Sequence, residues 1–268
     1  MMYEALEITR NGAVATIWMN RPQRHNAFDA ALIAELAQAF TQLGADEQTR
    51  IVILAGHGKS FSAGGDLNWM KAAGEAGFDA NLADAEQLAQ MFRILAELPK
   101  PTIARVHGAA LGGGMGLAAT CDICIASTQA IFATSEVRLG IIPAVISPYV
   151  LRAIGARQAS RYFLTAERID AAKALQIGLV HEVAEADALD AVIHELTSAL
   201  LYGGPQAQAA AKRLLHNVSG KMINDILVQE TAHIIAALRM NAEAREGLSA
   251  FLDKRAPAWI NRTGSDDV

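Results

Sequence analysis

Two glycine-rich turns contain the residues whose types and spacing could do chemistry. Residues 111–116 include three consecutive glycines between a strand-like and a helix-like run, and residues 62–66 have a similar setting. Glycine has no Cβ, so the backbone of such a turn can approach a ligand closely. The first amides of a following helix have no partner within it and favour negative charge. Two such turns can direct two N–H groups at one oxygen atom, which is an oxyanion hole for carbonyl chemistry.

Other uses of a glycine-rich turn remain open for either cluster taken alone. Residues 112–116 do not match the dinucleotide-binding spacing G-x-G-x-x-G, and they lack the lysine and serine or threonine that end a phosphate-binding P-loop. A turn that merely allows tight packing is the third alternative.

A carboxyl group is the second component that such chemistry needs. Glu136 lies in residues 132–143, where apolar neighbours predict a partly buried acid. Burial disfavours a charged carboxylate and raises its pKa, which suits proton transfer near neutral pH. An ordinary surface glutamate is the alternative interpretation.

The surrounding pattern predicts the elements that position these residues. A strand, a glycine turn and a helix occur twice, about 50 residues apart, which indicates a repeated ββα unit with its active face built from turns. Asp29 is expected to cap the first helix, and residues 71–81 are expected to form a mobile segment. The expected strands are 6–10, 13–19, 51–55, 102–107 and 123–126. The expected helices are 30–43, 84–98, 156–164, 170–176, 188–201, 206–219, 221–238 and 242–252.

Composition narrows the class of protein. The 268 residues are 52% hydrophobic, which permits a full core, and the net charge of -5 argues against a nucleic-acid or anionic-membrane partner. The beginning of the chain lacks the features of a signal peptide, and no apolar run reaches the roughly 20 residues of a membrane helix. The pair Cys121 and Cys124 lacks a second pair to complete a zinc site, so packing in a reducing, cytoplasmic compartment is expected, with no metal.

Several motifs together resemble the enoyl-CoA hydratase/isomerase (crotonase) superfamily. Residues 61–67 resemble its F-x-A-G-x-D signature, and residues 110–114, Asn20-Arg21-Pro22 and residues 136–143 follow its order over nearly the whole chain. The resemblance implies an α/β fold, a crotonase-like spiral of repeated ββα units with a helical C-terminal region. It also implies a core over residues 1–200 with the CoA-thioester site, and a trimerisation region over residues 201–268.

The resemblance further implies an acyl-CoA thioester substrate, with coenzyme A entering as part of it and no separate cofactor. Gly65 and Gly113 would supply the oxyanion hole and Glu136 the acid and base. The expected partner is the same chain, as a homotrimer or a dimer of trimers, with no nucleic acid and no membrane. The positions implied to contact substrate or CoA are Arg24, His25, Ala63, Asp66, Leu67, Asn68, Arg138 and Lys254.

One position departs from the family pattern. Typical hydratases carry a first glutamate where this chain has Gly116, so a single carboxylate is expected. Hydration is the predicted reaction. The amino-acid sequence of residues 62–70, 81–85 and 135–149 resembles that of bacterial methylglutaconyl-CoA and isohexenylglutaconyl-CoA type hydratases. Isomerisation between 3-enoyl and 2-enoyl thioesters uses one base equally well and is the alternative. A non-catalytic CoA-ester or RNA-binding protein is the second alternative.

Overall fold

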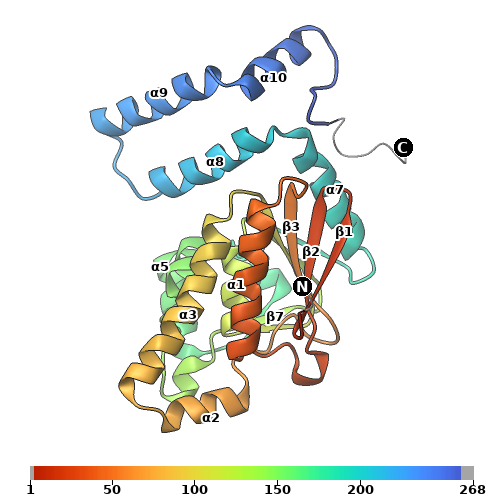
Figure 1. The fold of residues 1–268 in the computed structure, drawn as a ribbon. Coiled ribbons are helices and arrows are strands. Elements are labelled where there is room, and N and C mark those ends of the chain that lie inside the picture. Colours follow the sequence, from red (N-terminus) through yellow and green to blue (C-terminus); the bar gives the residue numbers. More distant parts are fainter. Residues whose placement is uncertain (1–2, 261–268) are drawn as a thin grey trace.

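A six-stranded sheet forms the centre of the structure, a computed structural model that describes residues 3–260 (Figure 1). Its strand order is β1-β2-β3-β4-β6-β9. The β1–β2 pair is an antiparallel hairpin that turns at Gly12, as expected, and the other neighbouring strands run parallel. The strands are β1 (Leu6–Asn11), β2 (Val14–Met19), β3 (Ile51–Gly56), β4 (Thr102–Val106), β6 (Ile123–Ser127) and β9 (Glu182–Ala184).

The burial of β3 shows that helices cover both faces of the sheet. Every residue of β3 is buried, as its unbroken apolar run requires. Val52 and Leu54 join the core beneath α1 (Ala30–Ala45) and α3 (Phe78–Glu97), which pack side by side in Figure 1. Ile51 and Ile53 point the other way and pack against α7 (Leu189–Tyr202). The Asp29 carboxylate caps α1 by accepting from the amide of Leu32, which confirms that prediction.

A second, three-stranded sheet positions the glycine turns. It contains β5 (Ala109–Leu111), β7 (Ile131–Ala133) and β8 (Ile169–Asp170), and β5 runs parallel to β7. A further parallel bridge joins Ser62 to Ala110. Three chain segments therefore advance side by side in one direction, so the residues that follow them lie at the same edge.

The helices that complete the fold divide into two groups. Those that precede the C-terminal region, besides α1, α3 and α7, are η1 (Pro22–Arg24), α2 (Leu67–Glu75), α4 (Gly113–Thr120), η2 (Glu136–Leu139), α5 (Ser147–Thr165) and α6 (Ala171–Gln176). α5 is interrupted at Gly155, whose φ of 72° is non-helical, next to the expected start of a helix at residue 156. Those of the C-terminal region are α8 (Pro205–Val218), α9 (Asp225–Arg239) and α10 (Ala242–Leu252). Residues 261–268 of that predicted region lie outside the described residues.

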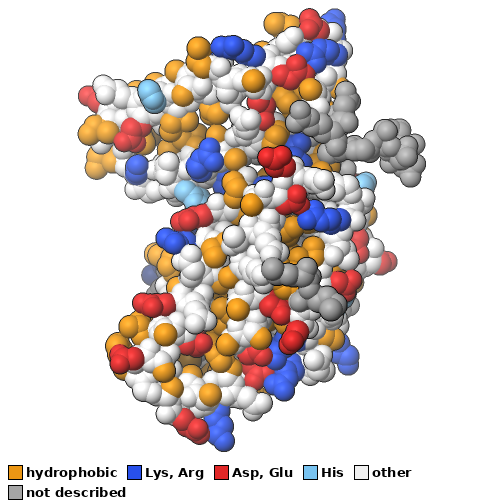
Figure 2. Space-filling model, viewed as in Figure 1, with side chains coloured by type: hydrophobic (Ala, Val, Ile, Leu, Met, Phe, Trp, Pro, Cys, Tyr) orange, Lys and Arg blue, Asp and Glu red, His pale blue; other side chains and the backbone are white. Residues whose placement is uncertain are grey.

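The C-terminal helices project from the sheets and carry exposed apolar side chains (Figures 1 and 2). In Figure 2 hydrophobic side chains gather at the end of this projection where α9 begins. Met222 and Ile223 before α9 are 81% and 84% exposed, and Phe251 at the end of α10 is 80% exposed. Such a concentration of large apolar residues is characteristic of a surface that a partner covers.

Most of residues 71–81, the segment expected to be mobile and placed before the helix at residue 84, is helical. Residues 71–75 complete α2, and α3 begins at Phe78. Asp66 starts α2 by accepting from the amides of Asn68 and Trp69. The Asn81 side chain then donates to the carbonyls of Ala73 and Ala76, which ties the two helices together. Such contacts between successive helices are not visible in composition.

The two cysteines are buried and free, in agreement with a packing role. Burial raises the pKa of the Cys121 thiol to about 12 and also raises that of Cys124. Both groups therefore stay protonated and unreactive at neutral pH. Across residues 3–260, no helix is long and apolar enough to cross a membrane.

Candidate active site

Three backbone segments bring both glycine turns and Glu136 to one edge of the second sheet. The amide of Ser62 donates to Ala109 and that of Leu111 donates to Ser62, each at 2.9 Å. The amide of Gly112 then donates to Ala133 at 2.8 Å. A Cβ placed on Gly112 would lie 3.1 Å from Glu136 Oε1 and 3.8 Å from Gly64 Cα. The carboxylate and the two turns, separated by about 70 residues along the chain, thus share one small space.

The amides of Gly65 and Gly113 are available to a ligand. Within the described part of the chain, neither amide has a hydrogen-bond acceptor. Gly113 is the first residue of α4, where an amide has no partner within the helix. Gly65 is fixed because the amide of Phe28 donates to the carbonyl of Gly64 and the amide of Asp66 donates to the carbonyl of Phe28. The ring of Phe28 also lies against Gly113, 3.0 Å from an added Cβ, so one residue supports both turns.

Glu136 is held in a poorly solvated position. It begins η2, directly after β7, and its Oε2 atom is buried without a hydrogen-bond partner among residues 3–260. Burial raises the pKa of this carboxyl above its ordinary value. A carboxyl of this kind holds and releases a proton closer to neutral pH than an exposed one does. The unpaired oxygen is the polar atom that a substrate or a water would contact.

The position of Gly116 is closed to any side chain. Gly116 lies inside α4, and a Cβ there would be 2.4 Å from Cγ2 of Ile146 and 3.1 Å from the ring of Phe92. Apolar groups therefore fill the space. Asp66 is already engaged by Arg24, and Glu86 is exposed on α3, so neither supplies a second carboxylate.

Comparison with known proteins agrees with this geometry. The family model described as enoyl-CoA hydratase/isomerase matches residues 9–262. The chain belongs to the enoyl-CoA hydratase/isomerase family. The 2,3-dehydroadipyl-CoA hydratase of Escherichia coli K12 is 33% identical over 96% of this chain and 99% of that protein.

Solved structures of the enoyl-CoA hydratase/isomerase family have the same fold. An enoyl-CoA hydratase from Shewanella pealeana is 46% identical, with a TM-score of 0.94 over 96% of each chain. An enoyl-CoA hydratase/isomerase from Marinobacter aquaeolei is 35% identical, with a TM-score of 0.90 over 96% of this chain and 100% of the other. The predicted α/β crotonase-like fold with a helical C-terminal region is thus confirmed, and the chain is an enzyme of the enoyl-CoA hydratase type.

The residues predicted to contact substrate or CoA near the first turn are in different situations. The Arg24 guanidinium donates to the Asp66 carboxylate at 2.8 Å and is half exposed. This ion pair and the cap of α2 occupy Asp66, and they lower its pKa. His25 contacts the hydroxyl of Ser60 through Nδ1 at 3.1 Å. Ala63 is half-buried between the turns, whereas Leu67 and Asn68 are exposed at the start of α2.

Two predicted contacts lie outside the two turns in the sequence. Arg138 is exposed on η2, two residues after Glu136. Lys254 follows α10, and α10 and α2 lie at opposite ends of the molecule (Figure 1). Sequence reasoning missed Phe28, Phe92 and Ile146, because apolar residues that shape a site carry no local signal.

Installing the first glutamate of typical hydratases should destabilise this protein. Gly116→Glu forces a side chain against Ile146 and Phe92, and overpacking alone costs about 1–3 kcal/mol before the burial of a charge. Urea unfolding should give a lower midpoint than for wild type. Gly74→Glu is the matched control, because Gly74 lies exposed in α2 with nothing within 4 Å of an added Cβ. Equal stability of the two variants would contradict the finding that residue 116 has no room for a side chain.

Proposed function

We propose that this enzyme adds water across the double bond of a 2-enoyl-CoA thioester with Glu136 as its single acid and base. The observation that carries the proposal is the meeting of Glu136, Gly64 and Gly112 at one sheet edge. The Glu136 carboxylate takes a proton from water as the water oxygen bonds to Cβ. The thioester becomes an enolate, and Glu136 returns the proton to Cα, so that H and OH are added in total.

The amides of Gly65 and Gly113 stabilise the enolate in this proposal. Negative charge collects on the thioester oxygen as water attacks, and donors already in place need no reorganisation at that moment. One donor of this kind contributes roughly 3–4 kcal/mol to the transition state. Their position at the start of α4 and just before α2 adds the favourable field of two helix N-termini.

Isomerisation is the second candidate, and the closed position at Gly116 is the observation that favours it. A single base can move a proton from one carbon to another without a second acid. Ile146 and Phe92 fill the place of that acid with apolar groups. Both reactions use the same carboxylate and the same oxyanion hole, so the substrate's double bond distinguishes them.

The proposed substrate carries a second carboxylate, as in glutaconyl-type thioesters. Arg138 supports this part of the proposal, because it follows Glu136 on η2 with its side chain exposed. A guanidinium binds a carboxylate through two parallel hydrogen bonds. A solvated surface arginine is the competing interpretation.

The proposed assembly is a homotrimer or a dimer of trimers built through α8, α9 and α10. Exposed apolar residues support an interface there; they include Met222, Ile223, Ile226, Phe251 and Leu252. In such an assembly Lys254 of one copy could join Arg24 and His25 of another at the phosphates of CoA. Arg24 is half exposed despite its ion pair, so it can turn part of its guanidinium to a ligand.

An absorbance assay distinguishes hydration from isomerisation. Hydration of a 2-enoyl-CoA should remove the absorbance of the conjugated thioester, because the product has no double bond beside the carbonyl. Isomerisation of a 3-enoyl-CoA should instead create that absorbance. We expect hydration of the 2-enoyl-CoA to be faster than isomerisation of the 3-enoyl-CoA at equal substrate concentration. Turnover of the 3-enoyl-CoA alone would replace hydration by isomerisation, and turnover of neither would sink both.

A further inference from the structure

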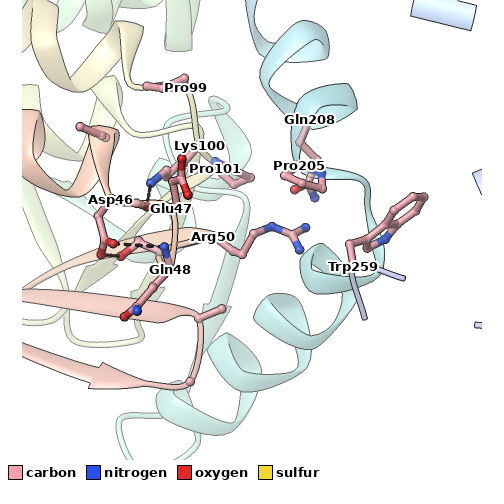
Figure 3. Close-up of a pocket in the computed structure, with 15 residues that line it drawn as sticks. Asp46, Glu47, Gln48, Arg50, Pro99, Lys100, Pro101, Pro205, Gln208 and Trp259 are labelled. Atoms are coloured by element: carbon pink, nitrogen blue, oxygen red, sulfur yellow. Dashed lines mark hydrogen bonds between the residues drawn. The ribbon is translucent and has the colours of Figure 1, made fainter. Parts of the chain in front are cut away.

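A cavity lies between the sheets and the C-terminal helices, and neither Glu136 nor the two glycine turns line it. Its volume is about 870 Å³, within the range that small-molecule sites occupy. Figure 3 shows it between the chain around Arg50 and Lys100 on one side and Pro205, Gln208 and Trp259 on the other. No part of the proposed reaction uses this space.

Arg50 extends into the cavity without a carboxylate partner. Its side chain leaves the chain just before β3, and the guanidinium lies toward Pro205 and Trp259 in Figure 3. Nη2 donates to the carbonyl of Gly203 at 2.5 Å, while Nε is buried and has no acceptor among residues 3–260. Within the same residues, no carboxylate lies at ion-pair distance from it. A half-buried cation with an unsatisfied donor is costly unless an anion balances it.

The acidic residues nearby are engaged elsewhere or face solvent. Asp46 pairs with Arg10 at 2.7 Å and accepts from the hydroxyl of Thr49. Glu243 accepts from the first amides of α8. Glu47 lines the cavity but is exposed. The negative charge of Glu243 therefore acts on the Arg50 guanidinium through space, without an ion pair between the two side chains among residues 3–260.

A second cation and an apolar wall complete the cavity. Lys100 Nζ donates to the carbonyls of Leu43 and Asp46 at 2.5 Å, so the ammonium is held by backbone atoms, and the Asp46 carboxylate acts on it through space. Burial acts on both cations in the same way, lowering the pKa of Arg50 and of Lys100. The apolar lining is supplied by Pro99, Pro101, Pro205 and Trp259.

We propose that this cavity binds a small anion that carries a carboxylate or phosphate group on an apolar body. Arg50 binds the oxyanion by donating hydrogen bonds from its free N–H groups, and Lys100 adds a second positive charge. The prolines and the indole of Trp259 contact the apolar body. Trp259 is itself held in place, because its Nε1 donates to the carbonyl of Tyr202 at 3.0 Å and its ring packs against Gly247.

Titration calorimetry with phenyl phosphate and with benzoate tests this site. The two probes share an apolar ring and differ in the oxyanion, so their relative affinities identify the preferred group. Wild type should bind at least one of them, and Arg50→Gln should weaken that binding roughly tenfold or more. Arg161→Gln is the matched control, because Arg161 pairs with Glu167 and neither residue lines the cavity, so binding should be retained. Saturating CoA should leave the affinity unchanged.

Several results would overturn the proposal. These are no binding of either probe to wild type, equal affinity in Arg50→Gln, equal loss in Arg161→Gln, or competition by CoA. A changed sedimentation rate of Arg50→Gln without any effect on probe binding would instead assign Arg50 to a contact between copies. If Arg50→Gln does not fold by circular dichroism, Arg50→Lys keeps the charge but loses the planar fork, and it should still weaken binding.

Discussion

Glu136→Gln should lower kcat for a 2-enoyl-CoA roughly 10²–10⁴-fold, while the Kd for the thioester changes little. The amide that replaces the carboxylate has nearly the same shape but cannot take a proton from water. Among residues 3–260 the space at Gly116 is filled by apolar groups and Asp66 is paired with Arg24, so neither position offers a second carboxylate to replace Glu136. The measurement is the loss of conjugated-thioester absorbance, with Kd determined by titration. Near-normal turnover would remove Glu136 from the mechanism.

Two controls accompany this variant. Glu86→Gln changes an exposed glutamate on α3 and should retain full activity. The second control is the free energy of unfolding, which reports on the surroundings of Glu136 without any substrate. Because burial raises the pKa of this carboxyl, the folded state holds the proton more tightly than the unfolded state. The ionised group therefore lowers stability as pH rises through the raised pKa. Glu136→Gln should be the more stable protein at neutral pH, and its advantage should vanish below the ordinary pKa of 4.5.

Gly113→Pro should lower kcat roughly 10²–10³-fold by deleting one oxyanion donor. Gly113 is the first residue of α4, where proline is well accommodated because its missing N–H would be unpaired in the helix. The preceding Gly112 has φ 50° and ψ -118°, the mirror image of an extended conformation, and this does not oppose a following proline. The same absorbance assay gives kcat and KM.

Gly113→Ala is the matched control for the missing donor. It adds the same Cβ against the ring of Phe28, 3.0 Å away, but keeps the N–H. The alanine variant should therefore lose much less activity than the proline variant at similar stability. Equal losses would mean that crowding against Phe28, and not the amide, explains the effect. Unchanged activity of both would exclude Gly113 from the oxyanion hole.

Short-range patterns in the sequence predicted most of the fold. The alternating and unbroken apolar runs of β1, β2, β3, β4 and β6 identify those strands, whereas the short strands β5, β7, β8 and β9 were not expected. Asp29 signals the start of α1 because a cap acts within three residues. Repetition of strand, glycine turn and helix indicated that the turns meet at one edge. The resemblance of short motifs then pointed to the family that the comparisons establish.

Composition misled the prediction where contacts between elements decide the structure. Residues 71–81 are small and polar, yet they form the end of α2 and the start of α3. The cap at Asp66 and the bonds from Asn81 to the carbonyls of Ala73 and Ala76 fix where one helix begins and how the next one joins it. Alanine, lysine and glutamate in this stretch favour a helix, and the glycines Gly74 and Gly77 do not prevent one.

The sequence by itself determined that a carboxylate and two glycine turns exist, and that the usual first acid is replaced by Gly116. Only the tertiary structure decided what that glycine means: Ile146 and Phe92 fill its space, so a second acid cannot stand there. Likewise, only the fold places Arg50 and Trp259 on opposite sides of one cavity. The physical reason is that packing depends on residues distant in the chain, whose meeting is set by strand order and helix docking and leaves no trace in local spacing.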